Sequence, residues 1–480
     1  MLRSPAVTHQ GPQHRILSDS QVRDLHLASL DILERTGVQV GHPRMRDILK
    51  KAGARVDGDR VRLPPRLVEW ALRSAPGKIT VHNRLGEVAM RLERGKVYFG
   101  NSVDCPYFLE PETGRSVQSR REHVGPMTRL ADALENISFI NPGGMINDMP
   151  FPIANRLVLK DVVSNTIMPV LFDPRSRSDL EAAIEVAGIV VGGPDQLKAK
   201  PYLMLYFETL APLFHPEDML EILLLAAEHS LPIVYTPMSI GGATAPLSLA
   251  GNLAICNAEV LSSITFAQIL NEGLPCIHGG IPGPMDMKTT RFPYCSPESM
   301  LLCAAFVELA NFYDLPSFGT AGITDAVVVD AQAGAEMALN IHLAALTGAN
   351  LVHDVAQIGG GDNTSPVALV LADELINMVK RLLRPVEITR ESLGLEAIDA
   401  IGPRGNFLKD KTTLKQCRQV WSPEFFNRKG VEGWDKDGLS LEDKLKKRVR
   451  EIWADYRPVP LPDKAAGLLE ELERKWWNSL

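Results

Sequence analysis

Carboxylate, histidine and threonine side chains recur directly after, or at the end of, short apolar runs of this sequence. The most prominent are Asp104, Glu208, His278, Thr320, Asp325 and His353. A wider polar set occupies similar positions: Asn101, Ser102, Asn141, Asn147, Asp148, Asp173, Thr209, Thr236, Thr324 and Asp354. Aromatic residues, among them Tyr98, Tyr206 and Phe207, lie in the same runs. Carboxylates mixed with aromatic faces suit a quaternary or alkylated amine, whose cation is diffuse and offers few N–H donors. Taken singly, each aromatic residue is also suited to filling a packed core.

Two further features could bind ligands. Cys276 and His278 are two residues apart in one run, so both would face the same side of a strand, where they could contribute to a zinc site. Gly359–Gly361 follow His353, and the backbone N–H groups of this loop, including that of Gly360, could hold an anion. The sequence contains no Gly-x-x-x-x-Gly-Lys-Ser/Thr, His-Glu-x-x-His or Gly-x-Ser-x-Gly motif. We therefore expect no nucleophile–base pair and no tightly bound metal or cofactor.

The composition narrows the function classes. Of the 480 residues, 45% are apolar and 23% charged, which is typical of a globular protein. A net charge of −7 argues against nucleic-acid binding by phosphate neutralisation. No uninterrupted apolar run reaches the ~18–20 residues of a membrane span, and Met1–Pro5 does not resemble a signal peptide. The expectation is a cytoplasmic protein that binds neither nucleic acid nor membrane.

Eight short apolar runs alternate with longer helical stretches from Lys96 onward. The runs are Val97–Gly100, Ile137–Asn141, Pro169–Phe172, Tyr202–Phe207, Pro232–Thr236, Pro275–His278, Pro316–Gly319 and Asn350–His353. Their starts lie 30 to 43 residues apart, the length of one strand, one helix and two loops. Eight such units predict an α/β fold, a (β/α)8 TIM barrel, with an open sheet as the alternative. In a barrel the carboxyl ends of the strands share one face, where the polar residues would meet.

The sequence divides into three parts. Residues 1–95 are expected to form an N-terminal α+β cap, in which Ser18 caps a helix that ends at Gly37 and Asp57–Gly58 turns a hairpin. Residues 96–386 would form the barrel, and residues 387–480 a C-terminal helical extension. Two amphipathic stretches of that extension, Leu441–Trp453 and Asp463–Trp477, suit a surface brace or an oligomer contact.

Several stretches resemble the trimethylamine methyltransferase family, whose members pass a methyl group from a methylated amine to a corrinoid protein. They are Leu25–Val38, Gly242–Asn252, Gly322–Asp325 with Asp330–Gly334, and Leu343–Val352. The resemblance implies a (β/α)8 barrel and extends to about residue 430. Members that use trimethylamine carry pyrrolysine, whereas this chain has standard residues throughout, and Gly319–Asp325 is where we would look for the equivalent position. It also lacks a histidine near Thr412, where members often have one.

The resemblance implies a small quaternary amine as substrate, with glycine betaine the best-known example. The corrinoid (cobalamin) would arrive on a partner protein, and we expect a homo-oligomer. We predict that Tyr98 and Phe207 contact the cation and that Glu208 or Asp104 adds longer-range charge. The carboxylate would meet His353, His278 or the backbone N–H groups of Gly359–Gly361, with His353 favoured. Two alternatives remain at this point. One is a non-catalytic binder of methylated amines, and the other is a zinc-dependent corrinoid methyltransferase that uses Cys276 and His278.

Overall fold

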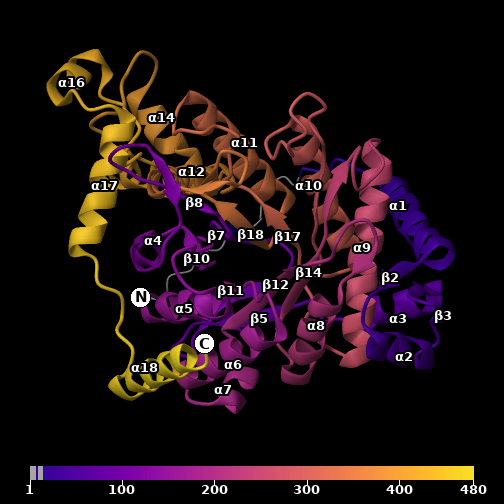
Figure 1. Ribbon diagram of the computed structural model, residues 1–480. Helices are drawn as coiled ribbons and strands as arrows, with labels where there is room; N and C mark the ends of the chain where they lie inside the picture. Colours follow the sequence, from indigo (N-terminus) through magenta and orange to yellow (C-terminus); the bar gives the residue numbers. More distant parts are fainter. Residues whose placement is uncertain (1–6, 9–13) are drawn as a thin grey trace.

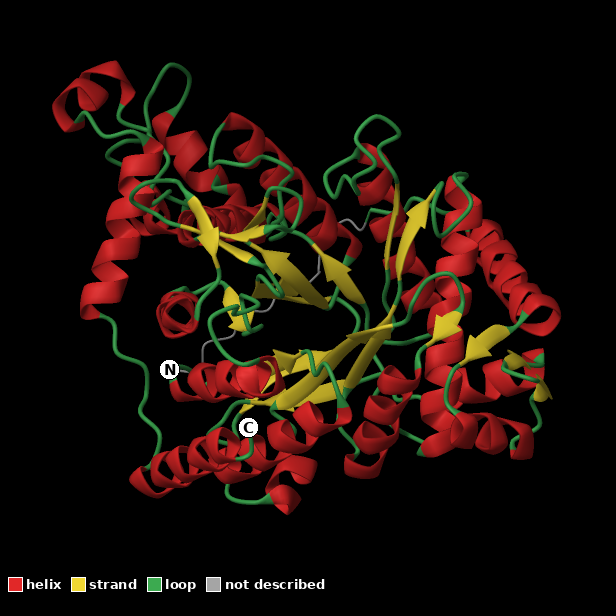
Figure 2. Ribbon diagram, viewed as in Figure 1, coloured by secondary structure: helices red, strands yellow, loops and turns green. Residues whose placement is uncertain are grey.

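A computed structural model describes residues 7–8 and 14–480 of the chain, apart from the side chains of residues 7–8 and 435–437. Figure 1 and Figure 2 show an α/β protein in which helices surround parallel strands. The predicted α/β class is confirmed.

The N-terminal part combines short helices with antiparallel strands. Its elements are β1 (Val7–Thr8), α1 (Asp19–Asp31), the π-helical η1 (Ile32–Thr36), β2 (Val38–Val40), α2 (Pro43–Lys51), β3 (Arg55–Asp57), β4 (Arg60–Arg62), α3 (Pro65–Ser74), β5 (Ile79–His82) and β6 (Val88–Leu92). Ser18 and Gln21 form a capping box at the start of α1, and Gly37 ends the helical segment with a φ of 73°. The β3–β4 hairpin turns at Gly58, as predicted.

Seven strands that run parallel to one another follow, together with a segment, residues 276–278, that joins its neighbours by single parallel bridges. The strands are β7 (Lys96–Asn101), β10 (Ile137–Phe139), β11 (Val170–Phe172), β12 (Leu203–Glu208), β14 (Ile233–Thr236), β17 (Phe318–Thr320) and β18 (Leu351–Val355). Parallel pairing leads from β7 to β10, through the Ile140–Val170 bridge to β11, and on to β12 and β14. Residues 276–278 join by single bridges to β14 and to Ser317, β17 pairs with β18, and β18 pairs with β7. The series of pairings therefore returns to its first strand.

One interior cluster receives a side chain from each of these eight segments. Its members include Tyr98, Phe139, Leu171, Met204, Val234, Ile277, Phe318 and Leu351, together with residues of β5 and β6. Neighbouring residues on each strand face the other way and pack against the helices, because strand side chains alternate. Nearly every segment thus has apolar residues on both faces, which explains the short continuous runs in the sequence.

Helices follow most of the strands, in the stretches between the predicted runs. They are α4 (Arg121–Ala133), α5 (Phe151–Ser164), α6 (Arg177–Val191), α7 (Pro194–Ala199), α8 (Glu217–His229), α9 (Leu249–Leu270), α10 (Pro297–Phe312), α11 (Ala331–Thr347) and α12 (Pro366–Leu382). In the described chain, α9 alone is long and apolar enough to cross a membrane, but 83% of that stretch is buried inside the protein. It is therefore a core helix.

Several short strands and the C-terminal helices complete the chain. The additional strands are β8 (Tyr107–Leu109), β9 (Ser116–Gln118), β13 (Phe214–His215), β15 (Met238–Gly241), β16 (Ile281–Pro284), β19 (Gln357–Ile358) and β20 (Asn363–Thr364). After α12 come α13 (Arg390–Leu393), α14 (Leu395–Ile401), α15 (Lys411–Gln416), the 3₁₀ turn η2 (Cys417–Gln419), α16 (Gly430–Asp437), α17 (Leu441–Asp455) and α18 (Asp463–Asn478). Lys160 and Arg121 form ion pairs with Glu473 of α18, so this helix braces α4 and α5.

Candidate functional site

A cavity of about 370 Å³ lies at the carboxyl ends of the parallel strands. Its lining combines carboxylates, aromatic rings and one histidine: Val103, Asp104, Met145, Asp173, Pro174, Arg175, Tyr206, Glu208, Met219, Ile281, Tyr294, His353, Asp354, Gln357, Gly360, Gly361 and Asp362. Its volume is within the usual range for a small-molecule site. Among the predicted residues, Asp104, Glu208, His353 and Gly360 meet here.

Strand β12 contributes an aromatic ring and a carboxylate to the same face. Tyr206 and Glu208 are two residues apart, so both point into the cavity, and the Tyr206 hydroxyl donates a hydrogen bond to Glu208. Burial raises the pKa of Glu208, and the Tyr206 hydrogen bond partly opposes that shift. Burial also raises the pKa of Tyr206 well above its usual value, so the phenol stays protonated.

Strand β18 ends in a histidine whose orientation is fixed. His353 Nδ1 lies 2.5 Å from Asp354 Oδ1, and the Thr320 hydroxyl donates to Asp354 Oδ2 at 2.5 Å. The imidazole stacks on Phe318, with ring centroids 4.2 Å apart. Since a carboxylate accepts, Nδ1 carries the proton that binds Asp354. His353 is 2% exposed, and its Nε2 has no hydrogen-bond partner among the described residues, although the side chain lines the cavity.

An arginine joins two carboxylates at another part of the cavity wall. Arg175 lies 2.7 Å from Asp104 Oδ2 and 3.1 Å from Asp173 Oδ2. Burial raises the pKa of Asp173 well above its usual value, and the neighbouring Asp104 raises it further. Burial lowers the pKa of Arg175, but the two carboxylates outweigh that effect and raise it overall. The cavity has five acidic side chains, and Arg175 is the one Lys or Arg among its described lining residues.

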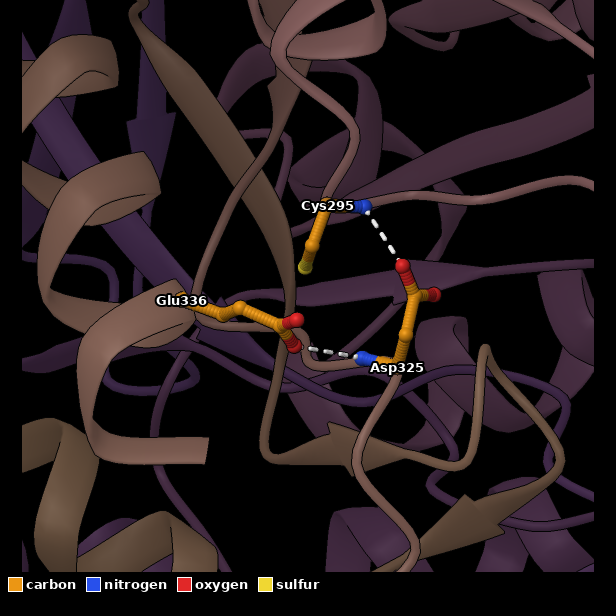
Figure 3. Close-up of side chains that lie close together, drawn as sticks. All are labelled: Cys295, Asp325 and Glu336. Carbon is orange, nitrogen blue, oxygen red and sulfur yellow. Dashed lines mark hydrogen bonds between the residues drawn. The ribbon is translucent and has the colours of Figure 1, made fainter. Parts of the chain in front are cut away.

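Asp325 holds a neighbouring loop instead of lining the cavity. Its carboxylate accepts the N–H group of Tyr294 at 3.2 Å. It also accepts the N–H group of Cys295 at 3.0 Å, while the Asp325 N–H donates to Glu336 at 2.9 Å (Figure 3). Because Tyr294 lines the cavity, Asp325 sets the position of that ring. The Cys295 thiol and the two carboxylates lie within 4.8 Å of one another, as potential metal ligands would. Burial raises the pKa of Cys295 and of Asp325, which disfavours the charged ligand forms.

The glycine loop after β18, predicted as an anion site, has few free N–H groups. Gly359, Gly360 and Gly361 all have positive φ, between 68° and 94°, a conformation that favours glycine. The Gly359 N–H donates to Ala326 O at 2.7 Å and the Gly360 N–H to Thr324 O at 3.1 Å. Two of the three expected donors are thus already used within the protein.

Five of the predicted binding residues do not line this cavity: Tyr98, Phe207, His278, Thr320 and Asp325. Tyr98 lies near the start of β7, where its hydroxyl accepts the Arg91 N–H at 3.0 Å beside β6. Phe207 faces the helices, because it is one residue away from both Tyr206 and Glu208, and it stacks on Tyr235. Thr320 acts through Asp354, as described above.

His278 faces outward and stacks on Phe306 of α10. Its Nε2 pairs with Asn257 Oδ1 at 2.9 Å, and burial lowers its pKa to about 3. Cys276, the other residue considered for zinc, accepts a hydrogen bond from Gln268 at 3.4 Å. Both side chains therefore have amide partners on α9, and the structure does not bring either to the cavity.

Sequence reasoning missed Arg175, Tyr294 and Gln357. Arg175 follows Asp173 by two residues, so its position after β11 was a usable signal. Tyr294 lies in the loop between β16 and α10, far from any expected strand end, and no pattern pointed to it. Gln357 belongs to β19, one of the short strands that the sequence did not reveal, and its side chain donates to Val103 O at 2.6 Å.

The chain is similar to known proteins over nearly its whole length. The family described as "Trimethylamine methyltransferase (MTTB)" matches residues 1–476. A glycine betaine methyltransferase of Desulfitobacterium hafniense is 30% identical over 94% of both chains. A trimethylamine methyltransferase of the same species is 28% identical over 95% of this chain and 92% of its own. Among solved structures, the monomethylamine methyltransferase of Methanosarcina barkeri aligns over 90% of this chain and 92% of its own, with 13% identity and a TM-score of 0.47.

Proposed function

The chain belongs to the trimethylamine methyltransferase family, and we propose that it moves a methyl group from a quaternary amine to the Co(I) corrinoid of a partner protein. Its activity as a methyltransferase follows from that membership. A betaine such as glycine betaine is the substrate class that we infer, because this chain has no pyrrolysine and the 30% identical relative is named for that substrate.

The observation that carries the proposal is the pairing of acidic and aromatic side chains in one cavity. Five acidic side chains against one arginine favour a cation, and the rings of Tyr206 and Tyr294 offer faces for an alkylated ammonium group. Contact of a methylated ammonium with an aromatic ring contributes about 0.5–2 kcal/mol. We now assign the cation contacts to Tyr206 and Tyr294 in place of Tyr98 and Phe207.

The other end of a betaine needs hydrogen-bond donors. His353 is our choice, because it lines the cavity, its Nε2 has no hydrogen-bond partner among the described residues, and an imidazolium offers an N–H donor on each nitrogen. Arg175 is a second cation at the cavity, already paired with Asp104 and Asp173. A carboxylate bound between His353 and Arg175 would leave the ammonium group against the aromatic rings.

This chemistry needs few groups from the protein. When the N–CH3 bond breaks, its electron pair stays on nitrogen and the leaving group is a neutral tertiary amine, so no general acid is required. The corrinoid, when docked, supplies the nucleophile that accepts the methyl group. The residues of this chain bind the amine, orient one methyl group toward the cavity opening and exclude water, and orientation alone can contribute several kcal/mol. A cavity of 370 Å³ fits a small amine, consistent with a corrinoid that approaches on its own carrier.

The finer features of the fold belong to the same proposal. We infer that the parallel pairings close a (β/α)8 barrel over residues 96–386, with residues 1–95 as a cap and residues 387–480 as an extension. The chemistry would then take place at the carboxyl face of the barrel.

A methylation assay tests the proposal. Reduced corrinoid is mixed with the protein and a panel of betaines, and the visible spectrum reports conversion of Co(I) to methyl-Co(III). We expect methylation from at least one betaine and none from trimethylamine. Betaine binding without any methyl transfer would support the non-catalytic alternative, and methylation from trimethylamine alone would contradict the substrate class.

A further inference from the structure

A second, smaller cavity lies among α10, α11 and the end of β17. Its volume is about 30 Å³, which is room for about one methyl group or one water molecule. Apolar side chains make up most of its lining, among them Met300, Ala304, Val307, Ile323, Leu343 and Ala344. We call this cavity the apolar pocket.

Three polar side chains in the lining of the apolar pocket already have partners within the protein. Asn340 donates to a backbone carbonyl at 2.8 Å, and Thr347 donates to another at 3.0 Å. The Thr320 hydroxyl donates to Asp354. These groups are therefore not available to a ligand, and the pocket suits an alkyl group better than water.

Tyr294 is the one residue that lines both the apolar pocket and the candidate site among the described residues. Its backbone is fixed, because Asp325 accepts the N–H groups of Tyr294 and of the next residue, Cys295 (Figure 3). Its ring packs edge-on against Phe292, with ring centroids 4.8 Å apart. The tyrosine is thus held where it can act as a wall between the two cavities.

The two cavities differ in what they can bind. The candidate site has five acidic side chains and Arg175, whereas the described lining of the apolar pocket contains no charged side chain. An ammonium group that carries only methyl groups needs the candidate site alone. A longer alkyl group on the nitrogen would gain apolar contacts in the pocket, but the ring of Tyr294 stands between.

We propose that Tyr294 determines which amines fit, by closing the apolar pocket to the alkyl groups on the substrate nitrogen. The proposal rests on the proposed function, because it takes the ligand of the candidate site to be an alkylated amine. Without the ring the two cavities would join, and a substituent of several carbons could extend between α10 and α11. Each methylene group buried there contributes ~0.8 kcal/mol, which is about a fourfold gain in affinity.

Titration calorimetry with two betaines tests the proposal. The probes are glycine betaine and the compound in which n-butyl replaces one of its N-methyl groups. Tyr294→Ala should change the ratio of the two dissociation constants by roughly tenfold or more in favour of the butyl compound, because three further methylene groups become buried. Glycine betaine itself should bind roughly two- to tenfold more weakly, because an aromatic contact is lost.

Two further variants separate access to the apolar pocket from a general loosening of the candidate site. Tyr294→Phe retains the ring and should retain the wild-type ratio. Ala304 is 3% exposed and lines the pocket from α10, so adding Ala304→Leu to Tyr294→Ala refills the space and should reverse the change in the ratio. A ratio that Tyr294→Ala leaves unchanged, or that Ala304→Leu does not reverse, would overturn the proposal. Circular dichroism verifies folding, and if Tyr294→Ala is unfolded, Tyr294→Leu takes its place with the same expectation.

Cys303 of α10 gives a measurement that does not depend on betaine affinity. Its thiol lines the apolar pocket, and burial raises its pKa to about 12. The probe is trimethylammonioethyl methanethiosulfonate, a thiol reagent that carries the same quaternary group as a betaine. Labelling of Cys303, followed by peptide mass spectrometry, should be roughly tenfold or more faster in Tyr294→Ala than in the wild-type chain, because the pocket then opens into the candidate site. Equal labelling rates would overturn the role of Tyr294 as a wall, whereas a wild-type chain that binds no betaine would contradict the proposed function instead.

Discussion

The strand ends at His353 and His278 place the same side chain in opposite surroundings. Both histidines are buried and both stack on a phenylalanine, Phe318 in one case and Phe306 in the other. The partner of the imidazole differs. His353 binds the Asp354 carboxylate and lines a cavity, whereas His278 binds the neutral amide of Asn257 and packs among aromatic rings.

That difference teaches how a histidine at a strand end is to be interpreted. Each ring leaves one nitrogen without a hydrogen-bond partner in the described part of the chain, Nε2 of His353 and Nδ1 of His278. An unpartnered buried nitrogen alone therefore does not mark a ligand site. A carboxylate bound to one ring nitrogen, together with a cavity beside the ring, sets His353 apart from His278.

Replacing His353 gives the largest expected effect. A hydrogen bond to a charged group contributes about 1.5–3 kcal/mol, so His353→Ala should weaken betaine binding roughly ten- to hundredfold. Isothermal titration with the betaine that the assay identifies measures the affinity, and differential scanning calorimetry on the same protein measures the melting temperature. An unchanged affinity with a lowered melting temperature would contradict the assignment of His353.

Replacing His278 should give the reverse pattern. His278→Ala leaves the Asn257 amide oxygen without its partner and opens a gap beside Phe306, so the free energy of unfolding should fall by about 2–4 kcal/mol. Betaine affinity of the folded protein should stay within about twofold. A large loss of affinity with little loss of stability would place His278 in the binding site and break the comparison.

The same comparison shows how much the sequence could predict. The eight runs and the helices between them are visible because both faces of the strands are apolar and the spacing is regular. Such runs do not show which side chains point to the interior and which to the helices, because a continuous apolar strand lacks the alternation of polar and apolar residues. The sequence therefore could not distinguish the orientation of Tyr206 from that of Phe207. Residue type therefore pointed to strand ends that line the cavity, and the structure was needed to choose between neighbours.

Contacts between distant loops account for the remaining differences. No pattern in the sequence indicates that Asp325 accepts the N–H of Tyr294, because these residues are 31 positions apart and belong to no regular element. The N–H groups of Gly359 and Gly360 donate to Ala326 O and Thr324 O. These contacts also join distant loops, so the sequence does not reveal them.

Glu208 offers a pH test that the His278 region cannot give. Burial raises the pKa of Glu208, so the side chain loses charge as the pH falls through a value above the usual glutamate range. Affinity for the cation should therefore rise with pH through that value, and Glu208→Gln should lower the affinity at pH 8 by about five- to tenfold. Titration calorimetry between pH 5 and pH 8 measures both effects.

The contribution of Glu208 to the free energy of unfolding changes with pH in the opposite direction to the cation affinity. A pKa that is higher in the folded than in the unfolded state means that the folded state holds the proton more tightly, so the contribution is present at low pH and lost as the pH rises through the folded-state pKa. Glu208→Gln should remove this dependence. Asp173→Asn is the control, because burial raises the pKa of that carboxyl as well. A pH profile that is unchanged by Glu208→Gln and flattened by Asp173→Asn would assign the titration to Asp173.

Thr320 gives the smallest expected effect and tests how His353 is held. Its hydroxyl donates to Asp354 Oδ2 at 2.5 Å, on the carboxylate whose other oxygen binds His353. Thr320→Val retains the shape and removes this one hydrogen bond to a carboxylate, which contributes about 1.5–3 kcal/mol to holding Asp354 and acts on the substrate only through His353. We expect KM to rise two- to tenfold with kcat nearly unchanged, because the loosened imidazole binds substrate less well and takes no part in bond breaking. Thr320→Ser retains the hydroxyl and should restore KM. If Thr320→Ser is as impaired as Thr320→Val, the methyl group packs the strand and Thr320 has no positioning role.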